Sequence, residues 1–177
     1  TTKINADNFS AFNSPNYPPL AEVGVDIRYN DKFILTPDYD KPVRFNYHLD
    51  NNVAILKLFP GIQESVVKSV FSIQGLKGVV LETFGSGNAL RDQWFIDTLD
   101  EAYTKGIVVV NVTQCLYGNV EMHRYGTGQH LEKLGVVSGH DMTSEAALAK
   151  LMTLIGNGKS PEEVRHYMSM SLRGEMS

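Results

Sequence analysis

From residue 53 onward, short apolar runs alternate with amphipathic segments. The apolar runs, each of strand length, cover residues 53–58, 79–81, 107–110 and 136–137. Continuous apolar runs are typical of strands that are buried on both faces, and their alternation with helices is typical of a parallel sheet. We therefore predict an α/β domain of three layers, in which about four parallel strands lie between two layers of helices.

The segments between these runs have the spacing of amphipathic helices. The predicted helices cover residues 62–74, 90–105, 126–134, 143–156 and 161–171. The last helix has a clear start, because Ser160 precedes Pro161 and Glu163 follows at the third helical position, which is a capping box with proline in the first turn. Thr143 predicts a similar start for the preceding helix, and Gly156 and Gly158 predict its end.

Residues 1–48 have a different pattern and contain five of the seven prolines. Prolines remove amide donors and exclude helix, so we expect an irregular arm that connects to another part of the protein. Val25 to Tyr29 alternate, Asn30 and Asp31 suggest a turn, and Phe33 and Leu35 alternate again, which predicts a hairpin over 25–35. The predicted division is a connector and hairpin arm over 1–48 and an α/β domain over 49–177.

Composition narrows the classes of protein. With 42% hydrophobic and 20% charged residues, the 177 residues are those of an ordinary globular chain. A net charge of −4 without runs of Lys or Arg argues against a nucleic-acid partner. No apolar run approaches the ~20 residues of a membrane span, so we expect no membrane partner. The single cysteine, Cys115, excludes an internal disulfide and favours the reducing cytoplasm. Because Thr1 opens the chain without Met or a leader, we expect the chain to be part of a longer protein.

Ligands of parallel sheets bind beyond the carboxyl ends of the strands, so the segments after each strand are candidate sites. Residues 82–88 follow the second strand and contain Gly85 and Gly87, which suggests a turn that opens a helix and takes a small anion. Simple helix entry without a ligand is an equal alternative. A dinucleotide site is disfavoured, because Leu90 replaces the third glycine and Asn111 stands where an acid is expected.

Residues 111–115 follow the third strand and end in Cys115. A nucleophilic thiolate needs a neighbouring base or helix N-terminus, and the histidine nearest in sequence is His123, so a buried or ligand-lining thiol is the better interpretation. The five histidines show no metal-ligand spacing, and we expect neither a metal site nor a cofactor. An amino-terminal nucleophile at Thr1 conflicts with the strand–helix alternation, because such enzymes are antiparallel sandwiches.

Five segments, in order along nearly the whole chain, closely resemble the C-terminal portion of the cytoplasmic type I bacterial L-asparaginases. They are NYPPLA (16–21), GSGN (85–88), GIVVVNVTQC (106–115), GHDMTSEAA (139–147) and LRGEM (172–176). The resemblance implies that the full protein hydrolyses L-asparagine to L-aspartate and ammonia. In that family a threonine of a Thr-Gly-Gly-Thr motif attacks the amide, assisted by a Thr-Asp-Lys set in the N-terminal domain.

No Thr-Gly-Gly occurs in these 177 residues, so we expect no catalytic residue on this chain and no activity of the chain alone. The resemblance implies a supporting α/β domain that packs against the N-terminal catalytic domain, in a homodimer or tetramer, and completes a neighbouring active site. Two alternatives stay open, a stand-alone ligand-sensing module and a purely structural dimerisation domain.

The resemblance also implies a regulatory asparagine site on the loops after strands two and three. Asn88, Thr113 and Cys115 match its pattern, and Gly87 lies beside Asn88. The allosteric bacterial members carry an arginine where this chain has Glu82, and an arginine there would hold the carboxylate of the effector. We therefore expect a weak or absent effector site formed by Glu82, Gly87, Asn88, Thr113 and Cys115.

Overall fold

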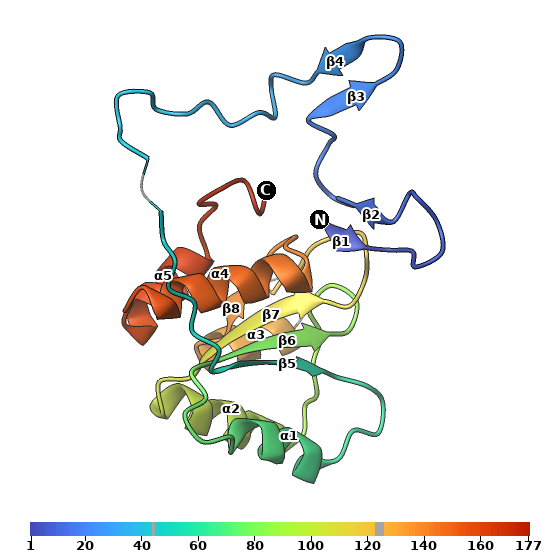
Figure 1. Ribbon diagram of the computed structural model, residues 1–177. Coiled ribbons are helices and arrows are strands. Elements are labelled where there is room, and N and C mark those ends of the chain that lie inside the picture. The colour runs from blue at the N-terminus through green and yellow to red at the C-terminus, as the bar shows by residue number, and fades with distance from the viewer. Residues whose placement is uncertain (44, 123–125) are drawn as a thin grey trace.

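The computed structural model describes residues 1–43, 45–122 and 126–177 (Figure 1). Its centre is a parallel four-stranded sheet with the order β5-β6-β7-β8, which confirms the predicted sheet. The strands are β5 (Val53–Lys57), β6 (Gly78–Thr83), β7 (Val108–Thr113) and β8 (Val137–Ser138). The spatial order follows the chain order, so every strand pairs with its neighbour in sequence and all carboxyl ends meet at one edge.

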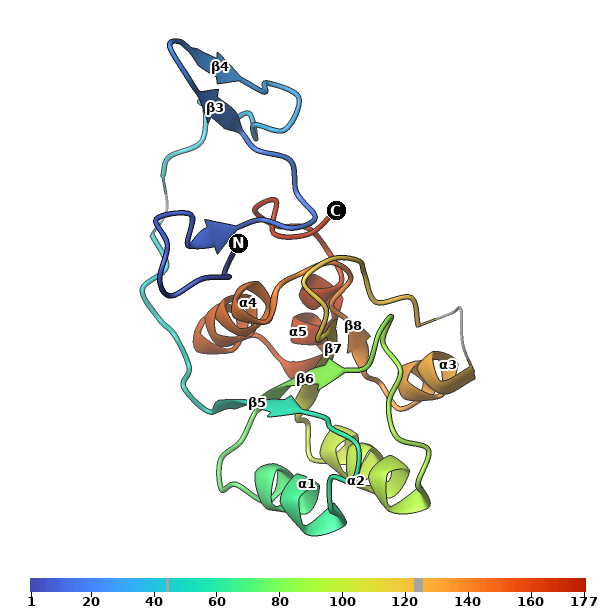
Figure 2. The ribbon, with the colours of Figure 1, turned by 90° about the vertical axis from the view of Figure 1, so that its right-hand side faces the viewer.

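In the described ranges, five helices cover the two faces of this sheet and make the three layers that we predicted (Figures 1 and 2). They are α1 (Glu64–Phe71), α2 (Gln93–Thr104), α3 (Gly126–Lys133), α4 (Ser144–Gly156) and α5 (Pro161–Met168). Side chains of α1, α2 and α3 pack on one face and those of α4 and α5 on the other. Among the described residues, no helix is long and apolar enough to cross a membrane.

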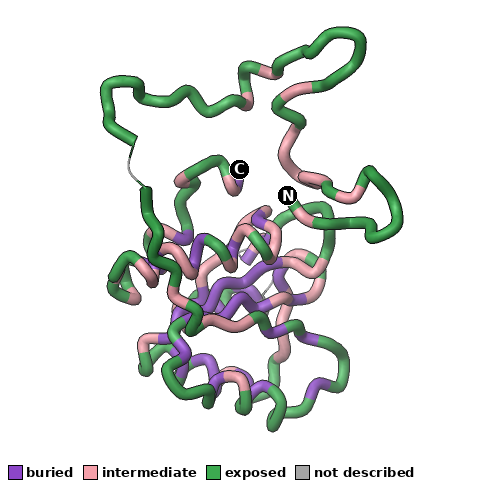
Figure 3. The backbone as a smooth tube through the Cα atoms, viewed as in Figure 1, coloured by how far each residue is buried: buried purple, intermediate pink, exposed green. Residues whose placement is uncertain are grey.

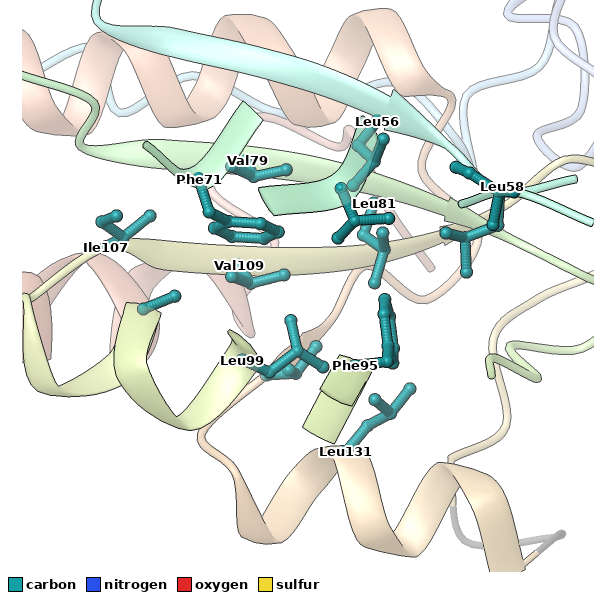
Figure 4. Close-up of a cluster of buried hydrophobic side chains, with 14 of the residues drawn as sticks. Leu56, Leu58, Phe71, Val79, Leu81, Phe95, Leu99, Ile107, Val109 and Leu131 are labelled. Carbon is teal, nitrogen blue, oxygen red and sulfur yellow. The ribbon is translucent and has the colours of Figure 1, made fainter. Parts of the chain in front are cut away.

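The two central strands, β6 and β7, are continuously apolar in sequence because both of their faces are buried. On β7, Val109 belongs to the cluster beneath α1 and α2, whereas Val108 and Val110 belong to the cluster beneath α4 and α5. Successive side chains point to opposite faces, so both faces of the strand must be apolar. Figure 4 shows the first cluster, in which Phe95 and Leu99 of α2 point at the sheet.

Helix starts follow their capping residues. The Ser160 hydroxyl accepts from the Glu163 amide at 3.3 Å, and the Glu163 carboxylate accepts from the Ser160 amide at 2.9 Å, which confirms the capping box. The hydroxyl of Thr143 caps α4 by accepting from the amide of Ala146. Helix α2 begins at Gln93, later than the predicted residue 90, because a tight turn over 84–88 and an extended segment intervene.

We call residues 1–48 the arm and residues 49–177 the body. The arm leaves the body and carries two small antiparallel ribbons, β1 (Thr2–Lys3) with β2 (Phe12–Asn13) and β3 (Ala21–Val23) with β4 (Ile27–Tyr29). The turn predicted at Asn30 and Asp31 forms, with the Phe33 amide donating to the Asn30 carbonyl at 2.9 Å, but within the described ranges it joins no strands. The arm contains a hairpin as predicted, but not over 25–35, because the strands pair across a turn at 24–26. Both faces of this ribbon are exposed, and without a buried face the alternation of side chains does not determine the register (Figure 3).

Candidate functional site

The polar segments after β6 and β7 lie side by side at the carboxyl edge of the sheet, where Thr83 and Thr113 are paired in register. A small pocket of about 170 Å³ opens there. Glu82, Thr113 and Cys115 all line it, so the structure brings three of the five candidate residues together. The loop before α4 and the arm, through Asn16, complete its wall.

Gly87 and Asn88 do not line this pocket; they form the 84–88 turn beside it. The amides of Gly87 and Asn88 both donate to the Phe84 carbonyl, at 3.1 and 2.9 Å, and α2 starts only at Gln93. These two amides are therefore engaged inside the turn, which does not open a helix as the sequence had suggested. The arrangement corresponds to neither the anion site nor the dinucleotide site.

The carboxylate of Glu82 is held in place from two sides. It accepts a hydrogen bond of 2.6 Å from the hydroxyl of Ser144, the first residue of α4, and its second oxygen lies 3.5 Å from the Lys57 ammonium. Only 15% of the Glu82 side chain is exposed. A fixed negative charge therefore stands in the wall of the pocket.

Two further carboxylates add to this charge. Glu145 accepts a 2.6 Å hydrogen bond from the Thr2 hydroxyl of the arm. Burial opposes its charged form, but hydrogen bonds from Thr2, its own amide and Thr143 outweigh burial and lower the pKa of Glu145. Asp141 accepts from the amide and hydroxyl of Ser177, at 2.8 and 2.7 Å. With Lys57 opposing three carboxylates, the wall favours a cationic group over a carboxylate.

Thr113 and Cys115 also line this pocket. The hydroxyl of Thr113 donates to the Gly85 carbonyl and accepts from the amide of Cys115 at 3.0 Å, so both of its functions are engaged. The thiol of Cys115 is exposed, and in the described ranges it makes no hydrogen bond or ion pair. His123 lies outside the described residues. Cys115 thus stands as a lining residue, without an adjacent base from the described part of the chain.

Sequence reasoning missed two side chains at this edge. Asn111 is fully buried on β7, and Gln114 donates to the carbonyls of Leu58 and Glu82, at 2.6 and 2.9 Å. Gln114 thereby joins the ends of β5 and β6. A polar residue inside the apolar run of β7 was the available signal for Asn111. In the described ranges, no three His, Cys, Asp or Glu side chains form a group that could hold a metal ion.

The chain is similar to known proteins over its whole length. A family model described as the glutaminase/asparaginase C-terminal domain matches residues 52–168. L-asparaginase 1 of Escherichia coli K12 is 40% identical over 186 residues, which is 100% of this chain and 52% of that protein. The mouse 60 kDa lysophospholipase is 42% identical over 178 residues, 100% of this chain and 31% of that protein.

Solved structures agree. L-asparaginase I from Vibrio cholerae superposes with a TM-score of 0.92 at 40% identity, covering 99% of this chain and 53% of that chain. The thermostable L-asparaginase from Thermococcus kodakarensis superposes with a TM-score of 0.86 at 32% identity, covering 99% and 52%. The chain therefore spans about half the length of these three asparaginases.

Proposed function

This chain belongs to the glutaminase/asparaginase family as its C-terminal domain, and we propose that it is the supporting half of an L-asparaginase. The observation that carries the proposal is the 40% identity across the whole chain to a protein of which it covers about half. A TM-score of 0.92 to an L-asparaginase I supports it. In the full-length protein the reaction is hydrolysis of the side-chain amide of L-asparagine to L-aspartate and ammonia.

The nucleophile of this reaction comes from outside these residues. A threonine hydroxyl attacks the amide carbon, ammonia leaves, and water releases aspartate from the acyl-enzyme. No Thr-Gly-Gly motif occurs in the chain. The chain contributes its carboxyl edge to the active site of a neighbouring subunit, in a cytoplasmic homodimer or tetramer. The division into a connector over 1–48 and a domain over 49–177 is part of the same proposal.

Ammonia release from L-asparagine tests this assignment. We expect the full-length parent protein to turn over asparagine and the purified 177-residue chain to release no ammonia above a blank from an asparaginase-deficient host. L-glutamine and a lysophosphatidylcholine belong in the same experiment, because the mouse relative is named a lysophospholipase. Turnover by the chain alone, or a parent protein inactive on both amides, contradicts the proposal. Asparagine binding by the chain without any activity of the parent favours a sensing module, and dimerisation alone favours a structural one.

The carboxyl-edge pocket is proposed as a weakened effector site. An amino acid presents a carboxylate, and the Glu82 carboxylate, which Ser144 and Lys57 hold in place, puts a negative charge where that carboxylate would lie. The turn with Gly87 and Asn88 lies beside the pocket, and the amides of these two residues already donate to the Phe84 carbonyl, so neither compensates for this charge. Asparagine therefore binds feebly or not at all at Glu82, Thr113 and Cys115.

Calorimetric titration of the full-length oligomer with L-asparagine tests the pocket. Glu82→Arg adds a charge-assisted pair of about 1.5–3 kcal/mol, so we expect affinity to rise by about ten-fold or more. Glu82→Gln is the matched control, since it removes the charge without adding a donor of this strength, and a smaller gain is expected. Sub-millimolar binding by the unaltered protein that Thr113→Val abolishes would show that Glu82 is no obstacle.

A further inference from the structure

A fully buried carboxamide lies in the middle of the sheet. Asn111 is 0% exposed on β7, the most enclosed part of the fold. A buried amide must find partners for both of its ends, or folding loses free energy. Its oxygen accepts a 2.6 Å hydrogen bond from the hydroxyl of Thr83, which is also 0% exposed. Its nitrogen donates to the Gly87 carbonyl at 3.1 Å.

These bonds join the sheet to the 84–88 turn. Every main-chain carbonyl of that turn accepts a hydrogen bond. Two of these carbonyls accept from within the turn: the carbonyl of residue 84 accepts from the amides of Gly87 and Asn88, and that of residue 88 accepts from the Phe84 amide. The other three accept from outside: the carbonyl of residue 85 from the Thr113 hydroxyl, that of residue 86 from the Glu121 amide, and that of residue 87 from the Asn111 carboxamide. Two of the three bonds that come from outside the turn are side-chain bonds from β7. The turn is thus held by hydrogen bonds from the sheet as well as by the hydrogen bonds within the turn itself.

The turn is also wedged in place. Gly87 has a φ of +105°, and a Cβ atom there would lie 2.7 Å from a methyl group of Val120 and 3.2 Å from the Asn111 nitrogen. The backbone of the turn therefore fits between Asn111 and Val120, and at position 87 only glycine, which has no Cβ atom, avoids a clash with them. A displacement of the Asn111 carboxamide moves one side of this wedge.

We propose that Asn111 and Thr83 are positioning residues, which set the 84–88 turn at the carboxyl edge that, under the proposed function, contributes to the active site of a neighbouring subunit. The proposal rests on the proposed function. A buried polar pair is a weak source of stability, because apolar residues of similar size stabilise a core as well or better. Orientation is the better reason for the pair, since a misplacement of about 1 Å near a reacting group can reduce the rate about 100-fold.

Two matched pairs of substitutions in the full-length protein test this role. Thr83→Val removes the hydroxyl that orients Asn111, and Thr98→Val removes another buried hydroxyl, which bonds to the Trp94 carbonyl within α2 rather than to the turn. Gly87→Ala displaces the turn directly, whereas Gly158→Ala places the same residue at a φ of +74° with open space around it. Each pair therefore makes the same chemical change at one residue that is connected to the turn and at one that is not.

We expect Thr83→Val and Gly87→Ala to lower kcat/KM for asparagine by about ten-fold or more, and to speed amide hydrogen exchange over residues 84–88. Thr98→Val and Gly158→Ala are expected to change kcat/KM by no more than about two-fold, and Thr98→Val is expected to lower Tm about as much as Thr83→Val. Thr83→Ser keeps the hydroxyl and is expected to restore activity. If one member of a pair fails to fold, the other pair decides.

Equal activity losses within each pair, or failure of Thr83→Ser to restore turnover, would overturn the positioning role and leave a merely structural one. That outcome is separate from failure of the proposed function, which is a parent protein without amidohydrolase activity. An active parent with unaffected Thr83→Val and Gly87→Ala variants rejects only the positioning role.

Discussion

The arm and the body contain the same kinds of apolar side chain, but the body buries them and the arm exposes them. In the body, Phe95 is 0% exposed beneath the sheet. In the arm, Phe9 is 110% exposed and Val25 is 105% exposed, and most of the arm is exposed along its length (Figure 3). In the body, backbone amides and carbonyls are hydrogen-bonded in a four-stranded sheet that helices cover on both faces. In the described part of the arm, the strands are two or three residues long and form two-stranded ribbons.

This difference shows that apolar side chains alone do not produce a core. An isolated two-stranded ribbon is marginally stable in water, and the arm holds to the body through polar anchors. One anchor is reciprocal, because the Asn16 carboxamide donates to the Gly118 carbonyl and accepts from the Gly118 amide, both at 2.9 Å. The exposed apolar side chains of the arm are suited to a further protein surface, which the proposed catalytic half provides.

The largest test of the comparison substitutes phenylalanine in both regions. Phe95→Ala removes a fully buried ring and is expected to lower the free energy of unfolding by about 3–5 kcal/mol. Phe9→Ala removes an exposed ring and is expected to change it by less than about 0.5 kcal/mol in the 177-residue chain. Urea unfolding followed by circular dichroism measures both. Comparable losses would mean that the arm folds onto the body.

The body was predictable because its sequence carries redundant signals. The continuous apolar runs of β6 and β7 require two buried faces, and the capping box at Ser160 starts α5 at the predicted residue. The arm carried fewer signals. Asn30 and Asp31 form the turn that they predict, yet the ribbon itself turns at 24–26, since no buried face selects one register.

The second test concerns the link between the body and its last residues. The buried Lys150 ammonium lies 2.6 Å from the Glu175 carboxylate. Burial opposes the charged form, but Lys150 and the amides of Leu172 and Arg173 outweigh it and lower the pKa of Glu175 from 4.5 to about 2. A lowered pKa stabilises the fold at pH values above 4.5, and this stabilisation is lost as the pH falls from about 4.5 to about 2.

After allowance for solvent screening, this contribution is about 1–2 kcal/mol. Glu175→Gln is therefore expected to flatten the loss of stability between pH 5 and pH 2, as measured by urea unfolding across that range. Glu162→Gln in the exposed first turn of α5 is the control and is expected to leave most of the slope. An unchanged slope for Glu175→Gln would show that solvent screens the pair.

The third test compares capping in the two regions. Ser160→Ala removes the cap of α5 and is expected to cost about 1 kcal/mol. Asn8→Ala removes a similar local bond in the arm, where the Asn8 oxygen accepts from the Ser10 amide at 2.9 Å, and is expected to cost less than about 0.3 kcal/mol. Thermal unfolding of both variants measures the contrast. An equal cost would place the 5–10 loop of the arm inside the cooperative unit.

The sequence predicted the position of the candidate site correctly, but only some of the residues that line it. The rule that ligands bind beyond the carboxyl ends of parallel strands located the pocket with Glu82, Thr113 and Cys115. It did not show that the amides of Gly87 and Asn88 are used within their own turn, or that Asn16 of the arm reaches the wall. Both are long-range or turn-level contacts, which residue types and local spacing do not specify.

The smallest expected effect lies within the β3–β4 ribbon, where Glu22 and Arg28 are directly opposite each other. Opposite charges at such positions contribute about 0.2–1 kcal/mol, with exposed pairs at the low end, and like charges destabilise. Arg28→Glu is therefore expected to depopulate the ribbon, seen as loss of cross-strand nuclear Overhauser effects between 22 and 28, while the global free energy of unfolding stays constant. Arg28→Lys keeps the charge and is expected to keep the ribbon. If Arg28→Glu instead lowers the global stability, the ribbon unfolds together with the sheet, and the arm and the body are one cooperative structure.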